Sequence, residues 1–140
     1  MSQPPQEQPP QQGGPVFENI IVYLQDSDMD DKGNFNVEPD MPMIVMCQGN
    51  YCGYCKQAKP AFAQAARTMF NQALFCTIHF DSENKDEREL GHRVGKFVEI
   101  PGLPCWFAVG KDGKIKGKYS GDRSAASFEE FARKAIATNE

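Results

Sequence analysis

The sequence lacks three features that would assign it to other classes of protein. Among 140 residues, 15 Lys and Arg stand against 19 Asp and Glu, for a net charge of −4. There is no clustered basic face, which argues against a nucleic-acid partner. No apolar run approaches the ~20 residues that a membrane helix needs. The first residues, MSQPPQEQPPQQGGP, contain neither a basic n-region nor the apolar core of a secretory signal. We therefore expect a cytoplasmic protein that acts on neither nucleic acid nor membranes.

Cysteine is present in an odd number, which argues against a complete disulfide framework. Static disulfides are rare in a reducing compartment, where a close cysteine pair is more often catalytic or metal-binding. The five cysteines are Cys47, Cys52, Cys55, Cys76 and Cys105.

Composition divides the chain into a tail and one domain. Residues 1–15 are rich in proline and glutamine, cannot build a core, and are predicted to be disordered. Residues 16–140 have the length of one domain with a single substantial core.

Hydrophobic patterning predicts strands that alternate with helices. Short apolar runs predict strands at 20–24, 43–47, 74–80, 105–109 and 115–119, the last two joined by an Asp-Gly hairpin. Apolar residues at spacings of three and four predict helices at 52–70, 83–97 and 124–138. An acidic loop is expected at 25–41. This order favours an α/β fold with a mixed central β-sheet flanked by helices on both faces.

The predicted helices have apolar stripes that should face the core. The stripe residues are Ala58, Phe62, Ala65, Ala66 and Met69 in the first helix, Leu90, Val94 and Phe97 in the second, and Phe128, Phe131, Ala132 and Ala135 in the third. Ser124 is the predicted N-cap of the third helix.

The pair Cys52-Gly53-Tyr54-Cys55 allows three interpretations. With Cys76 and His79 it matches a zinc-like spacing, but these two residues lie three apart in a predicted strand and would point to opposite faces. A structural disulfide closing so short a loop would stabilise little. We therefore expect no metal site.

The third interpretation is a reversible redox pair. Cys52 would lie where a buried strand ends and a helix begins, and the unpaired N–H groups and dipole there stabilise a thiolate. Such a position lowers the pKa of a thiol and makes it the attacking group. Cys55 lies one turn further along, close enough to resolve a mixed disulfide.

These residues resemble the thioredoxin family over roughly 16–140. The matching features are an aromatic residue followed by C-G-x-C-K at 51–56, a proline eight residues after the first cysteine (Pro60), a second proline opening the next strand (Pro104), and a hairpin followed by Gly121 before the last helix.

The resemblance implies a thiol–disulfide oxidoreductase that reduces protein disulfides. Cys52 would be the nucleophile and Cys55 the resolving thiol. The Leu103–Pro104 bond would be cis, and the Leu103 backbone would pair with an extended substrate peptide. The expected substrate-binding residues are Tyr51, Gly53, Tyr54, Leu103 and Pro104. No bound cofactor is expected; thioredoxin reductase or glutathione would donate electrons to a monomer.

The chain departs from the family at four positions. Met46 replaces a buried aspartate, Thr77 its lysine neighbour, and Gln48 a tryptophan, while Gly-Tyr replaces Gly-Pro between the cysteines. Two alternatives therefore stay open: a disulfide oxidant or isomerase, and a non-catalytic binding module that docks partners through the tail or the 25–41 loop. Cys105, next to Pro104, is either a packing residue or a third redox thiol.

Overall fold

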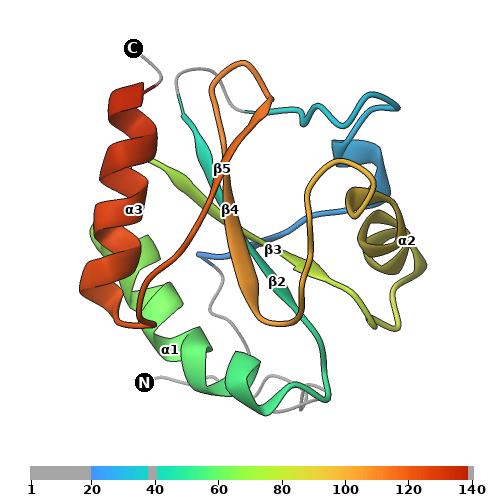
Figure 1. Ribbon diagram of the computed structural model, residues 1–140, viewed down its shortest axis with the longest axis horizontal. Helices are drawn as coiled ribbons and strands as arrows, with labels where there is room; N and C mark the ends of the chain where they lie inside the picture. The colour runs from blue at the N-terminus through green and yellow to red at the C-terminus, as the bar shows by residue number, and fades with distance from the viewer. Residues whose placement is uncertain (1–19, 38–40, 139–140) are drawn as a thin grey trace, which may run out of the picture.

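The computed structural model describes residues 20–37 and 41–138 of the chain (Figure 1). The predicted disordered tail at 1–15 lies outside the described residues. Among the helices described, none is both long enough and apolar enough to span a bilayer.

A five-stranded mixed sheet forms the centre of the molecule, with strand order β1-β3-β2-β4-β5. Strands β1, β3 and β2 are parallel, and β4 runs antiparallel to both β2 and β5. The strands are β1 (Val22–Tyr23), β2 (Met43–Gln48), β3 (Leu74–His79), β4 (Cys105–Val109) and β5 (Ile115–Lys118). The predicted mixed sheet is confirmed.

Helices cover both faces of this sheet, as predicted. Helices α1 (Gly53–Thr68) and α3 (Ala125–Thr138) pack together on one face, whereas α2 (Lys85–Val94) lies on the other (Figure 1). A 3-10 turn, η2 (Asp26–Asp28), packs against α2.

Strand β2 separates two hydrophobic clusters, and all six of its residues are buried. Because side chains alternate along a strand, Ile44 and Met46 join the cluster under α1 and α3, which we call the α1–α3 cluster. Val45 and Cys47 join the cluster on the opposite face, which we call the α2 cluster. A continuous apolar run is what a strand covered on both faces requires.

Three predictions about local structure were wrong. Strand β1 has two residues rather than five. Helix α2 ends at Val94, so Phe97 does not extend its apolar stripe and is 39% exposed. The 25–41 segment is not wholly a polar loop, since Met29 and Phe35 are buried in the α2 cluster.

The hairpin between β4 and β5 holds this segment in place. Gly113 has a φ of 83°, a left-handed conformation that Asp-Gly turns favour. Its carbonyl accepts a hydrogen bond from the Phe35 N–H at 2.7 Å. The hairpin therefore connects the β4–β5 side of the sheet to Phe35, in the buried part of the 25–41 segment.

Candidate active site

The two cysteines lie at the junction of β2 and α1. Cys52 is the N-cap residue of α1, and its sulfur accepts a hydrogen bond from the Cys55 N–H at 3.1 Å. The two residues are joined by a disulfide, with their Cα atoms 5.2 Å apart. The sequence prediction of a cysteine pair at the start of a helix is thus confirmed in its geometry.

The two sulfur-bearing side chains differ in access to solvent. Cys52 is half-buried, whereas Cys55 is fully buried in the α1–α3 cluster. Dissolved molecules can therefore reach Cys52, whereas Cys55 is shielded from solvent. The two sulfur atoms therefore occupy different environments, one facing solvent and one inside the core.

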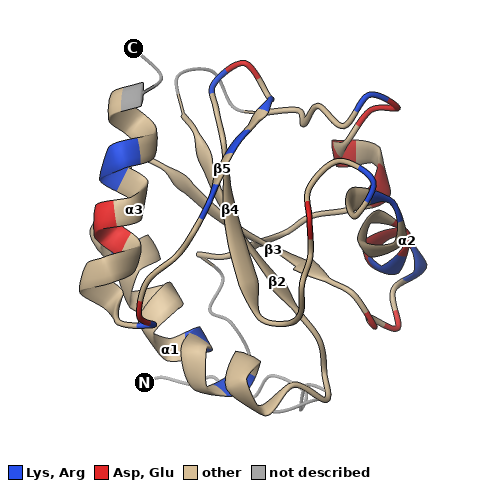
Figure 2. Ribbon diagram, viewed as in Figure 1, with Lys and Arg blue, Asp and Glu red and all other residues tan. Residues whose placement is uncertain are grey.

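The charged residues of α1, the helix that begins at the cysteine pair, are all positive. It contains Lys56, Lys59 and Arg67 and no acidic residue, and Figure 2 shows the acidic residues on other elements. Lysines near a helix N-terminus add to the attraction that the helix dipole exerts on a thiolate. The helix that begins at the pair therefore adds positive electrostatic potential around Cys52.

The loop before β4 lies against the turn that leads to Cys52. The Leu103–Pro104 peptide bond is cis, as predicted. A Cβ built on Gly49 would lie 3.2 Å from the Leu103 Cδ1, so Leu103 packs directly over this turn. The Cys52 N–H donates a hydrogen bond to the Gly49 carbonyl. Gly49 therefore contacts both Cys52 and the Leu103 side chain of the loop.

The tyrosines of the predicted substrate-binding set are exposed. Tyr51 is 95% exposed and Tyr54 64% exposed. Arg123 lies 5.7 Å from the Tyr54 ring and 5.6 Å from the Trp106 ring, so it bridges the two aromatics. A Cβ on Gly53 would meet nothing within 4 Å, so the chain leaves open space beside this residue.

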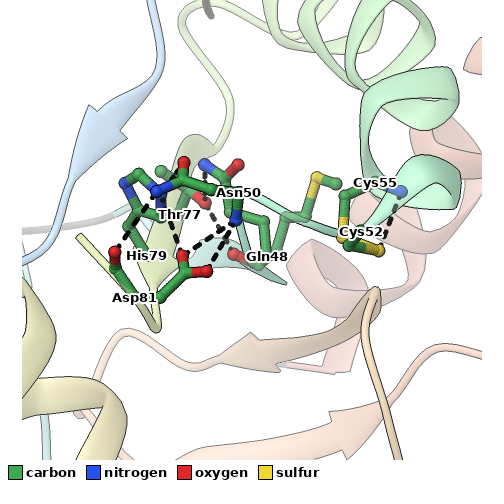
Figure 3. The surroundings of a disulfide bond; sticks show 8 residues. Gln48, Asn50, Cys52, Cys55, Thr77, His79 and Asp81 are labelled. Atoms are coloured by element: carbon green, nitrogen blue, oxygen red, sulfur yellow. Dashed lines mark hydrogen bonds and ion pairs between the residues drawn. A yellow bond between two sulfur atoms is a disulfide. The ribbon is translucent and has the colours of Figure 1, made fainter. Parts of the chain in front are cut away.

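A polar cluster that the sequence did not reveal lies at the carboxyl ends of β2 and β3 (Figure 3). The Asp81 carboxylate accepts hydrogen bonds from the Asn50 N–H at 2.8 and 3.0 Å. The His79 Nε2 lies 2.7 Å from the Asn50 Oδ1 and 3.4 Å from an Asp81 oxygen. These contacts fix the turn at 49–51, just before Cys52.

Two basic side chains near this cluster, those of His79 and Lys59, have lowered pKa values. Burial lowers the pKa of His79, against the opposing attraction of Asp81 and Glu87. Burial also lowers the pKa of Lys59, with Lys56 acting in the same direction and Asp81 opposing. Lys59 lies four residues after Cys55, on the same helix face. Its position in an otherwise apolar stripe was the signal that could have identified it.

Uncharged groups stand where the resemblance to thioredoxins implies a buried charged pair. Met46 and Thr77 are both fully buried, and the Thr77 hydroxyl donates to the Met46 carbonyl at 2.8 Å. The Gln48 amide donates to that hydroxyl at 3.0 Å. Within the described part of the chain, the Gln48 Oε1 is buried without a hydrogen-bond partner.

The zinc-like spacing does not converge on one point. Cys76 is buried in the α2 cluster, whereas Cys55 belongs to the cluster on the opposite face of the sheet. No group of three His, Cys, Asp or Glu side chains among residues 20–37 and 41–138 is placed to hold a metal ion.

Comparison with known proteins places the chain in a family. The family model "Thioredoxin" matches residues 29–134. The "Putative thioredoxin-like protein 453L" of Invertebrate iridescent virus 6 is 35% identical over 103 residues, covering 61% of this chain and 74% of the viral protein. The chain belongs to the thioredoxin family.

More distant matches include two long chains that contain a similar segment and one chain of comparable length. "Protein disulfide-isomerase 2-3" of Arabidopsis thaliana is 25% identical over 115 residues, which cover 82% of this chain but only 24% of the plant protein. Full-length ERdj5 superposes with a TM-score of 0.63 at 13% identity, over 84% of this chain and 16% of that one. A thiol:disulfide interchange protein from Chlorobium tepidum TLS superposes with a TM-score of 0.54 at 19% identity, over 69% and 81% of the two chains. The structural matches show the shared fold, and the family supports a protein of the thiol–disulfide oxidoreductase type.

Proposed function

We propose that this protein reduces disulfides of other proteins through a Cys52/Cys55 dithiol–disulfide cycle. The Cys52 thiolate attacks a substrate disulfide, forms a mixed disulfide and releases one substrate thiolate. Cys55 then loses its proton and attacks the Cys52 sulfur, which releases the reduced substrate and leaves the Cys52–Cys55 disulfide. Two electrons from a donor regenerate the dithiol.

The observation that carries this proposal is the unequal burial of the two sulfurs. Cys52 is half-buried at the helix N-terminus, and Cys55 is fully buried one turn along. The first position suits an attacking thiolate, which needs access and electrostatic stabilisation. The second suits a resolving thiol, which should attack its neighbour and no outside partner.

The substrate would bind beside the pair as an extended peptide. The Leu103 backbone, held by the cis bond to Pro104, would offer a strand-like edge to that peptide. Tyr51, Gly53 and Tyr54 would form the rim around the attacked disulfide. We further propose a cytoplasmic monomer that takes electrons from thioredoxin reductase or glutathione and uses no bound cofactor.

The test is a trapping experiment that uses insulin with its disulfides intact as the probe. The Cys55→Ser variant should accumulate a mixed disulfide between Cys52 and insulin, because the resolving thiol is gone. The matched Cys52→Ser variant should trap nothing and turn nothing over. Trapped species are identified by mass and by their loss on adding dithiothreitol.

Two outcomes would overturn the proposal. If the Cys52→Ser variant traps insulin and the Cys55→Ser variant does not, the roles of the two cysteines are reversed. If the wild-type protein fails to reduce insulin in the presence of dithiothreitol, the reductase activity is absent and a binding module is the better account.

A second candidate is a disulfide isomerase or oxidant. It is favoured by the plant relatives named protein disulfide-isomerases. Two refolding assays separate these activities from simple reduction: a fully reduced substrate reports oxidation, and a substrate with scrambled disulfides reports isomerisation.

A further inference from the structure

Two further cysteines face each other across the central pair of strands. In the antiparallel ladder between β2 and β4, Cys47 lies directly opposite Cys105. Directly opposed residues in such a ladder have Cα atoms about 4.5 or 5.5 Å apart, depending on the hydrogen-bonding pattern. Disulfides join Cα atoms about 4.4–6.8 Å apart, so either pattern allows a bond.

The two thiols are close neighbours. Both are reduced, and their directly opposed positions in the ladder let each thiol shift the pKa of the other. Cys47 is fully buried in the α2 cluster, and Cys105 packs against that cluster while remaining partly exposed. This arrangement reproduces, on the opposite face of the sheet from the Cys52–Cys55 pair, the combination of one accessible and one buried thiol.

The surroundings distinguish the two thiols chemically. The neighbouring Cys47 thiol lowers the pKa of Cys105, with partial burial opposing and Lys118 adding to the lowering. The neighbouring Cys105 thiol and burial together raise the pKa of Cys47. Cys105 is therefore the thiol that ionises more readily, and it is also the more accessible to solvent.

The remaining thiol, Cys76, has no such arrangement. It is fully buried, and its partners in the sheet are Val22 on β1 and Val45 on β2. Its thiol donates to the Leu74 carbonyl at 3.7 Å, and burial raises its pKa. Cys76 therefore serves as an internal control for any chemistry at the other two.

We propose that Cys47 and Cys105 form a second dithiol–disulfide couple, which exchanges with low-molecular-weight disulfides through Cys105. The Cys105 thiolate attacks a small disulfide, forms a mixed disulfide and releases one small thiolate. Cys47 loses its proton and attacks the Cys105 sulfur, which releases the second small thiol and closes the Cys47–Cys105 bond. One small disulfide is reduced to two thiols, and two protein thiols are oxidised to one disulfide.

This bond would join the two segments that frame the candidate active site. Cys47 precedes Gly49, the residue over which Leu103 packs, and Cys105 follows the Leu103–Pro104 bond. Oxidation of the second couple would therefore link the turn before Cys52 to the loop proposed to bind substrate. The couple does not depend on the activity of the first pair.

The experiment uses the full chain with Cys52→Ser and Cys55→Ser. Only the thiols of Cys47, Cys76 and Cys105 can then react with a disulfide or with the alkylating agent. The protein is incubated with glutathione disulfide, quenched in acid, denatured, alkylated and mapped by peptide mass. We expect the alkylated forms of Cys47 and Cys105 to be lost together, a cross-linked peptide to appear, and Cys76 to stay alkylated. Adding Cys47→Ala should leave Cys105 as a stable mixed disulfide with glutathione.

The same peptide mapping on the wild-type chain controls for the case in which the double-serine variant does not fold. There the cross-linked peptide of Cys47 and Cys105 should appear in addition to the one containing Cys52 and Cys55. Full alkylation of Cys47 in both proteins, whether or not Cys105 carries glutathione, would overturn the proposal. Equal loss of Cys76 would also overturn it, since this would show reaction of an unfolded chain.

Discussion

At the residue scale, Asp81 and His79 show how the turn before Cys52 is held. Asp81 accepts two hydrogen bonds from one backbone N–H, that of Asn50, and His79 contacts both residues. His79 is partly buried, and burial lowers its pKa below the ordinary value of 6.5. Its neutral form is therefore the one that the folded state prefers.

This preference predicts how stability depends on pH. Since the unfolded chain binds a proton at His79 more readily than the folded one, the free energy of unfolding should fall as pH drops below about 6.5. His79→Gln should remove this contribution, which is at most about 1.4 kcal/mol per pH unit. Urea unfolding at a series of pH values measures it.

The matched control is His92→Gln, on the exposed side of α2. This variant should keep the wild-type dependence on pH. If His79→Gln also keeps it, the histidine titrates alike in both states and its assigned role in the turn is wrong.

At the element scale, the β4–β5 hairpin depends on one glycine. Gly113 has positive φ, and a Cβ there would lie 2.3 Å from the Phe35 carbonyl oxygen. Gly113→Ala should therefore lower the free energy of unfolding by about 1–3 kcal/mol or more, through backbone strain and the clash. Gly117→Ala in β5 is the control, because a Cβ there meets nothing within 4 Å.

Chemical denaturation of the two glycine variants gives a clear comparison. Gly117→Ala should be neutral or slightly stabilising, since alanine restricts the unfolded chain more than glycine. Equal stability of the two variants would mean that the hairpin does not anchor the 25–41 segment.

Some elements were predictable from sequence because their signals are local. β4 was predicted at its observed bounds, and the stripe of α1 is buried at every predicted position. Phe97 was misplaced because helical spacing continues past Val94 although the helix does not, and its ring instead lies over Gly33.

The candidate site was predictable only in part for a related reason. The cysteine pair and the cis bond belong to short, specific motifs. The polar cluster of Asn50, His79 and Asp81 joins residues about thirty positions apart, and no local pattern pairs them. Likewise, Cys47 and Cys105 become neighbours only through the register of β2 and β4.

At the scale of the whole molecule, aromatic packing joins the helices of one face to the sheet. Phe62 of α1 is fully buried, with its ring 5.1 Å from that of Phe75 on β3 and 5.4 Å from that of Phe128 on α3. Phe62→Ala should lower the free energy of unfolding by about 3–5 kcal/mol, because it leaves a cavity between three elements.

Phe70→Ala, at a position 63% exposed, is the control for this substitution. It should change stability by no more than about 0.5 kcal/mol. Similar losses in both variants, measured by urea unfolding, would contradict the assignment of Phe62 to the centre of the α1–α3 cluster.

The function of the whole molecule depends on the direction in which it moves electrons. The measurement that tests this most directly is the reduction potential of the Cys52–Cys55 pair, equilibrated in glutathione buffers of known ratio and determined by mass after thiol trapping. Cys47→Ala and Cys105→Ala versions isolate this pair from the second one. A protein-disulfide reductase should have a potential near that of thioredoxin, about −270 mV. A value of about −180 to −120 mV, in the range of isomerases and oxidants, would contradict the proposed reductase activity.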